Sequence, residues 1–122
     1  MANGIAAAIY ERTLASLLDG VAAAPAETYP FAHVYFQNLF PADVYSEMLA
    51  ALPDSAHYAA AAERHYGDAT GNSVRWMYAL SHDGLHRLPP RHCELWRGVA
   101  AALADPALKR AVFAKLAPDL AY

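Results

Sequence analysis

The sequence has few charged residues and no dense run of one sign. Lys and Arg number 9 and Asp and Glu 12, so the formal net charge is −3, and charged side chains make up only 17% of the 122 residues. Nucleic-acid binding requires clustered cations that displace the counterions condensed on the phosphate backbone. The composition therefore predicts no nucleic-acid partner.

Cysteine and long apolar runs are also scarce. The single Cys93 excludes an intrachain disulfide and fits a reducing compartment. The first residues lack a basic segment, and Glu11 and Arg12 soon interrupt their apolar run, so no signal peptide is expected. No later stretch approaches the length of a membrane span. We predict a cytoplasmic protein without a membrane partner.

Apolar residues are abundant, at 57% of the chain, and much of the excess is alanine, which favours helix. The length allows a single domain over residues 1–122, with an N-terminal helix over 1–22 and a strand–helix support region over 30–122. We expect Asn3 to cap the first helix. The helix places on one face the apolar residues Ile5, Ile9, Leu14, Leu17, Leu18 and Val21.

The support region alternates between strand and helix patterns. Residues 23–28 predict a loop, and the apolar run 33–40 predicts a strand covered on both faces. A helix then begins with Pro41 in its first turn and ends at Pro53. Its apolar stripe contains Val44, Tyr45, Met48, Leu49 and Leu52.

The rest of the region predicts three more helices and a second strand. Residues 54–63 favour a helix capped by Asp54 or Ser55, residues 67–72 a turn, and the alternating residues 73–80 a strand. Residues 82–90 should be irregular, because Gly84 and two prolines interrupt them. Two helices end the chain. The first presents on one face Leu95, Trp96, Val99 and Leu103. The second begins with the cap Asp105 and with Pro106 at its first position, and its apolar face contains Leu108, Val112, Phe113 and Leu116.

The predicted fold class is thus α+β, helix-rich with two or three strands, and its sheet is small. A lone strand pair is marginal in water, so such apolar strands require neighbours. Further strands encoded beyond Tyr122 would provide them. A second copy of the chain could supply the missing edge, or the helices could cover the pair completely.

The organisation of residues 28–122 resembles the N-terminal portion of Fe(II)/2-oxoglutarate-dependent dioxygenases of the prolyl-hydroxylase-like kind. The resemblance rests on Pro30-Phe31-Ala32-His33 at a strand, Phe40-Pro41 at a helix start and a strand containing Arg75. It extends through Glu94-Leu95-Trp96 to the helix start Asp105-Pro106-Ala107-Leu108. It implies that this region leads into a double-stranded β-helix, or jelly roll, that the chain does not contain.

The resemblance also implies that the intact parent uses Fe(II) and 2-oxoglutarate to hydroxylate a small-molecule or peptidyl substrate. Such an iron site needs two His and one carboxylate on one face, usually beginning with H-x-D or H-x-E on a strand. The one match here is His92-Cys93-Glu94, at the start of a predicted helix, where positions i and i+2 point apart. We therefore predict no catalytic residue and no metal ligand within the chain.

Other motifs carry little functional information. His82 and His86 have the i, i+4 spacing of a metal-binding pair on a helix. Gly84 and the two following prolines disfavour a helix here, so we predict a surface loop with two titratable imidazoles. Cys93 beside His92 predicts a small buried thiol instead of a nucleophile. The glycines match no phosphate-binding loop.

Three residues of the second strand are the candidates for lining a substrate or co-substrate site: Arg75, Trp76 and Tyr78. In the resembled fold a strand here borders the active-site cleft. The structural alternative places Trp76 and Tyr78 in the core and pairs Arg75 with a carboxylate.

Two functions remain at this stage. The first is the helical support of an oxygenase, whose partner is the C-terminal part of the parent. The second is a non-catalytic α+β module for protein interaction or self-association, whose apolar strands pair with a partner or a second copy.

Overall fold

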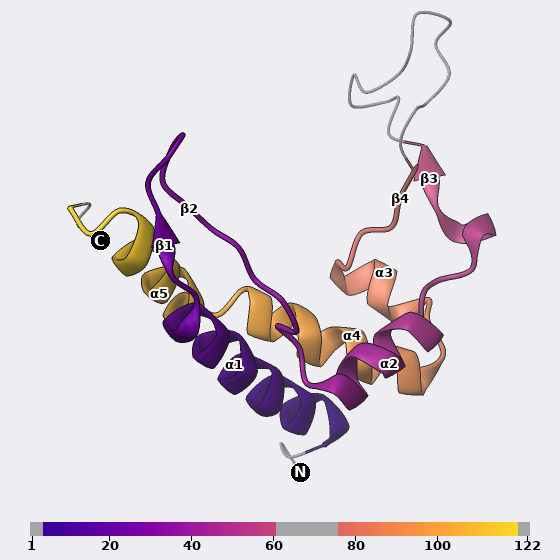
Figure 1. Cartoon of the computed structure of the whole chain (residues 1–122). Coiled ribbons are helices and arrows are strands. Elements are labelled where there is room, and N and C mark those ends of the chain that lie inside the picture. Colours follow the sequence, from indigo (N-terminus) through magenta and orange to yellow (C-terminus); the bar gives the residue numbers. More distant parts are fainter. Residues whose placement is uncertain (1–3, 61–75, 120–122) are drawn as a thin grey trace, which may run out of the picture.

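A computed structural model of the chain describes residues 4–60 and 76–119 and shows a helix-rich α+β arrangement (Figure 1). Its elements, in chain order, are α1 (Ile5–Ala23), β1 (Ala26–Glu27), β2 (His33–Val34), α2 (Ala42–Ala50), the 3₁₀ turn η1 (Ser55–His57), β3 (Ala59–Ala60), β4 (Trp76–Met77), α3 (His82–His86), α4 (Pro90–Leu103) and α5 (Pro106–Leu116). Among the helices it describes, none combines the length and apolar character needed to cross a membrane.

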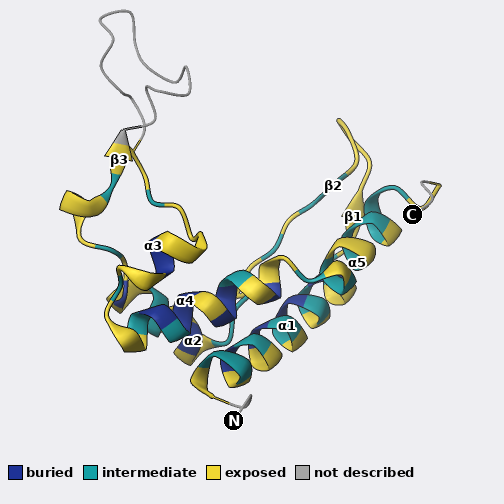
Figure 2. Ribbon diagram, turned by 180° about the vertical axis from the view of Figure 1, so that it is seen from behind, coloured by how far each residue is buried: buried dark blue, intermediate teal, exposed yellow. Residues whose placement is uncertain are grey.

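The core lies between α1 and α4, whose buried faces meet (Figure 2). The predicted α1 helix is confirmed, but its buried stripe is narrower than expected and includes a polar residue. Its buried members recur every four residues, as one helix face requires, at Ile9, Thr13, Leu17 and Val21. The buried residues of α4 are Cys93, Leu95, Trp96, Gly98, Val99 and Ala102.

Both ends of α1 are capped by distant side chains. Gly4 precedes the helix and offers no side-chain cap, and Asn3 lies outside the described residues. Instead, Glu94 Oε2 accepts a hydrogen bond from the Ala6 N–H at 3.2 Å. At the other end, Lys115 Nζ donates to the Ala22 carbonyl at 3.1 Å. The negative and positive charges stand at the ends where the helix dipole favours them.

Helix α2 is anchored on the core near both of its ends. Val44 and Ala51 are buried, and the Trp96 indole N–H donates to the Ala51 carbonyl at 2.9 Å. This carbonyl lies at the end of the helix, where no backbone N–H of a following turn is present to donate to it. Three of the five residues of the predicted stripe are exposed: Tyr45, Leu49 and Leu52.

Two ion pairs flank this docking site. Arg12 reaches Asp43 at 2.6 Å, and Arg91 reaches Glu47 at 2.5 Å. All four side chains are substantially exposed, so each pair contributes about 0–1 kcal/mol. The pairs orient α2 more than they stabilise it.

The predicted strand over 33–40 is wrong beyond Val34. The strand is the two-residue β2, which pairs with β1 inside the expected loop 23–28, with Ala26 opposite Val34. Asn38 adopts φ 54°, a left-handed conformation that ends an extended path. The Ser16 hydroxyl then donates to the Leu39 carbonyl at 2.6 Å, which fixes the segment along α1.

The predicted helix over 54–63 is also wrong in its described part, residues 54–60. Asp54 caps as expected, accepting from the Ala56 N–H at 3.0 Å, but only the turn η1 follows. Strand β3 comes next and pairs with β4, with Ala59 opposite Met77. Long-range pairing has overridden the helix propensity of alanine. The expected turn 67–72 and the first part of the strand 73–80 lie outside the described residues.

The region 82–90 is more ordered than expected, since α3 forms despite Gly84. Ser81 caps it by accepting from the Gly84 N–H at 3.2 Å, and the Tyr78 hydroxyl donates to the Gly84 carbonyl at 2.7 Å. A Cβ at position 84 would lie 2.0 Å from the Ala79 carbonyl oxygen, so the close turn requires glycine.

The two C-terminal helices are confirmed, including the cap at Asp105 and Pro106 at the first position. Leu103, expected on the buried face of α4, is instead 50% exposed. The predicted face of α5 is only half-buried, because this helix packs along one side of α1 at the edge of the core (Figure 1).

Replacing Thr13 with valine should stabilise the protein. Thr13 is fully buried, and its hydroxyl has no hydrogen-bond partner among the described residues. Valine has nearly the same shape as threonine but no hydroxyl that must lose its water without gaining a partner. The free energy of unfolding should therefore rise by about 1 kcal/mol. Urea unfolding of both proteins measures the gain. A loss of stability in Thr13→Val would show that the hydroxyl has a partner.

Acid should weaken the contact between α1 and α5. Asp105 accepts hydrogen bonds from the Tyr10 hydroxyl and the Ala107 N–H, which hold its pKa below the ordinary 3.8. A carboxyl with a lowered folded pKa contributes stability above its unfolded pKa and loses it as pH falls through the folded one. The loss should begin below about pH 4.

Asp105→Asn tests this loss, because asparagine keeps an N-cap oxygen while removing the charge. The variant should be less stable at pH 7, and the difference from wild type should shrink in urea unfolding curves recorded between pH 5 and 2.5. A difference that stays constant over this range would contradict the assignment to Asp105. Tyr10→Phe should show the same trend.

Candidate functional site

Large apolar side chains are exposed at two places on this helical base. The hairpin surface comprises Tyr29, Phe31 and Tyr35, whose exposed fractions are 88%, 66% and 74%. The α2 surface comprises Tyr45, Leu49, Leu52 and Trp76, with exposed fractions of 51%, 54%, 54% and 64%. Monomeric proteins rarely leave extended apolar patches uncovered, so both surfaces are candidates for contact with other protein.

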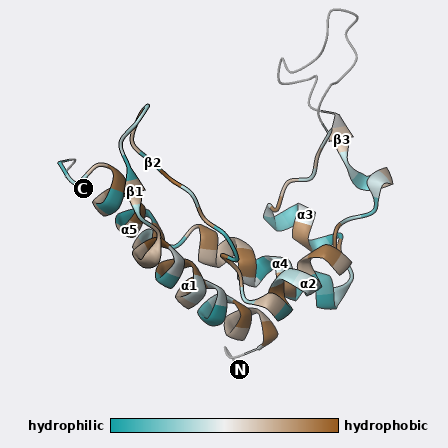
Figure 3. Cartoon of the chain, in the orientation of Figure 1, coloured by the Kyte–Doolittle hydropathy of each residue, from teal (hydrophilic) through white to brown (hydrophobic). Residues whose placement is uncertain are grey.

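The hairpin surface is held by short-range contacts. His33 Nδ1 lies 2.8 Å from the Phe31 carbonyl oxygen, and the two rings are 5.4 Å apart. Beyond the β1–β2 pairing, neither strand has a further strand neighbour in the described part of the chain. The segment between β2 and α2 is partly hydrophobic and partly hydrophilic (Figure 3), and its residues are half-buried or exposed.

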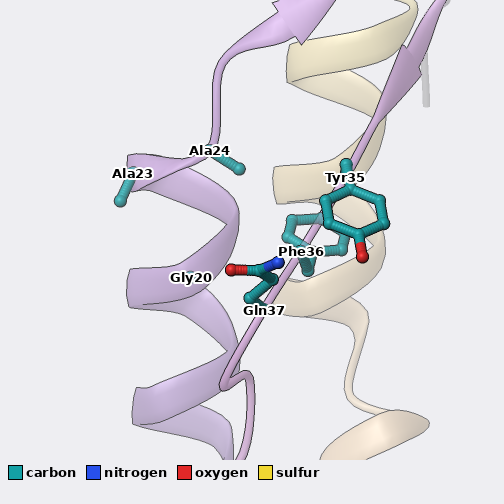
Figure 4. A pocket seen from close by; sticks show the side chains of 6 residues that line it. All are labelled: Gly20, Ala23, Ala24, Tyr35, Phe36 and Gln37. Atoms are coloured by element: carbon teal, nitrogen blue, oxygen red, sulfur yellow. The ribbon is translucent and has the colours of Figure 1, made fainter.

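A groove of about 360 Å³ runs between that segment and the end of α1 (Figure 4). Gln37 points towards α1, and Tyr35 points away from it. The lining residues are small, apolar or neutral: Gly20, Ala23, Ala24, Tyr35, Phe36 and Gln37. The groove therefore offers an amide and an apolar wall but no charged group.

A second groove, of about 540 Å³, lies beside α2 and includes the predicted residue Trp76. The lining is predominantly apolar: Leu52, Pro53, Ser55, Tyr58 and Trp76. Tyr58 is fixed from behind by an edge-to-face contact with Tyr78, with ring centroids 5.9 Å apart. The groove thus has aromatic and aliphatic walls and suits an aromatic or aliphatic side chain.

The three predicted lining residues have different positions. Arg75 lies outside the described residues. Tyr78 is half-buried, and its hydroxyl is used by Gly84, so it supports the turn before α3. Trp76 is open to contact. Leu52 and Tyr58 line the same groove as Trp76. Sequence spacing does not predict this grouping, because it does not show which segments lie side by side.

The one H-x-E match in the sequence does not have the arrangement of a dioxygenase iron site in the described part of the chain. Within His92-Cys93-Glu94, Cys93 is buried. The Glu94 carboxylate accepts from the Ala6 N–H and from Arg97 at 3.2 Å. Over residues 4–60 and 76–119, no three His, Cys, Asp or Glu side chains come together as a metal-binding group. Glu94 is accordingly a structural residue.

Comparison of the chain with protein-family models, with curated proteins and with solved structures finds no match in any of the three.

Proposed function

We propose that residues 1–122 form the N-terminal helical support of an Fe(II)/2-oxoglutarate-dependent oxygenase. In this proposal the hairpin surface and the α2 surface pack against a jelly-roll sheet that the chain itself does not contain. The observation that carries it is the contrast between a well-packed α1–α4 core and exposed aromatic residues on two very short hairpins.

The energetics favour a covering sheet. Burial of apolar surface yields about 25 cal/mol per Å², so covering several aromatic side chains outweighs the loss of their rotamer freedom. Two-stranded hairpins are marginal in water, and a neighbouring strand would satisfy their open edges. Both hairpins extend from the same side of the helices, where one sheet could contact them together (Figures 1 and 2).

In this role the chain would brace the sheet and border the substrate entrance near Trp76. In this proposal the iron ligands lie in the C-terminal part of the parent, as the resemblance implies. The proposed cofactors of the parent are Fe(II) and 2-oxoglutarate, and its substrate is a small molecule or a peptidyl side chain that becomes hydroxylated.

The test is a longer protein, expressed from the reading frame extended beyond Tyr122. It should contain H-x-D or H-x-E followed by a distant His, and it should consume 2-oxoglutarate with Fe(II) and oxygen. Trp76→Ala should reduce this consumption more than Leu103→Ala, a matched loss of exposed apolar surface on α4. A folded, iron-loaded longer protein that consumes no 2-oxoglutarate with any candidate substrate would refute the proposal.

The open hairpin edges also favour the second function, a module that associates with a second copy. Sedimentation equilibrium of residues 1–122 distinguishes the two. Self-association through the hairpin would give a concentration-dependent mass that Tyr35→Asp abolishes, because this variant places a charge on the exposed hairpin surface. A monomer at all concentrations would favour the support role.

A further inference from the structure

We propose that His82 and His86 form a two-ligand binding site for a borderline divalent transition metal ion such as Zn²⁺. The site is independent of the proposed oxygenase function. It depends on the formation of α3, because the sequence predicted an irregular segment over residues 82–90.

The two imidazoles already lie together. Their ring centroids are 4.2 Å apart with an interplanar angle of 50°, because one helical turn separates the residues. Zn²⁺ binds imidazole nitrogen at about 2.0–2.1 Å, and a small side-chain rotation would bring one nitrogen of each ring to that distance from a shared ion. Both residues are exposed, so the rings can rotate and the ion can enter from solvent.

One charged neighbour favours a cation and one opposes it. Asp83 Oδ1 lies 3.6 Å from His82 Nδ1, which leaves His82 Nε2 available for the metal. Arg87 follows His86 and opposes the cation through its positive charge. Two imidazoles suit zinc, copper and nickel, and water would complete the coordination.

Local structure organises the pair before the ion arrives. The Ser81 hydroxyl caps the turn, and Tyr78 holds the Gly84 carbonyl. Leu85 is buried against the core, so the opposite face of α3, with both histidines, is turned to solvent. Ser81 is a positioning residue that acts through the helix.

The experiment is a titration of the full chain with Zn²⁺ alone, followed by calorimetry and by the imidazole proton signals in NMR. Wild type should bind one Zn²⁺ at pH 7.5, with the His82 and His86 signals shifting first.

Variants locate the site. His82→Gln and His86→Gln should each weaken binding at least about tenfold, since loss of even an outer-shell partner costs that much. Ser81→Ala keeps both ligands and should weaken binding by up to about fivefold, the factor of a typical N-cap. His57→Gln, at an exposed histidine of η1, is the matched control and should bind as wild type does.

Equal Zn²⁺ binding by wild type and the His82→Gln/His86→Gln double variant would overturn the proposal. So would shifts of the His57 signals as early as those of His82, or no binding by the wild-type protein. Far-UV circular dichroism of each variant separates loss of a ligand from loss of the fold.

Discussion

Trp96→Ala is expected to destabilise the protein by about 3–5 kcal/mol, the usual cost of removing a buried tryptophan. Trp96 is 8% exposed and packs within the cluster that joins α1, α2 and α4. Its removal also leaves the Ala51 carbonyl without its indole partner. Urea unfolding followed by far-UV circular dichroism measures the loss without depending on tryptophan emission.

Two further variants divide this loss into its parts. Trp96→Phe keeps much of the packing but not the N–H, so it should cost about 1–3 kcal/mol. Trp76→Ala makes the same change at a tryptophan that is 64% exposed, and it should alter stability by less than about 0.5 kcal/mol. Similar losses at both tryptophans would contradict the assignment of Trp96 alone to the core.

Gly98→Ala is expected to destabilise the protein by about 2 kcal/mol. A Cβ there would lie 2.6 Å from the Ala6 carbonyl oxygen and 2.9 Å from Ile9 Cβ, so the α1 backbone would have to move. Overpacking costs about 1–3 kcal/mol, here at its upper end, and the helix propensity of alanine returns up to about 1 kcal/mol. Thermal unfolding should show a decrease in Tm of roughly 5–10 °C.

Gly20→Ala is the matched control, because it makes the same substitution in the neighbouring helix. A Cβ at position 20 would lie 2.6 Å from Leu39 Cδ1, the end of a side chain that can rotate. This variant should therefore stay within about 1 kcal/mol of wild type. An unchanged Tm in Gly98→Ala would show that α1 and α4 are further apart than described.

Helices whose start and stop signals are local could be predicted from the sequence. Asp105 with Pro106 defines the start of α5, and Asp54 caps the turn that follows it, because capping involves residues two or three positions apart. The buried residues Leu17, Trp96 and Val99 also follow from helical spacing alone. Cys93 is buried as its chemistry predicted.

The strands could not be predicted to the same extent. The apolar composition of 33–40 favours a strand, but the chain turns at Asn38 and is fixed by Ser16, a residue more than twenty positions away. Alanine around Ala59 favours helix, but pairing with Met77 makes it a strand. The exposure of the α2 surface could not be predicted for a related reason. Helical spacing identifies an apolar face but does not show whether another element covers it.

The sequence by itself determined the helix-rich α+β class, the long α1 and the starts of the C-terminal helices. It did so because propensity and spacing act over a few residues. The tertiary structure alone decided that Glu94 and Lys115 cap α1 and that Gly98 brings α1 against α4. These contacts join residues that only packing brings together, and no local signal encodes them.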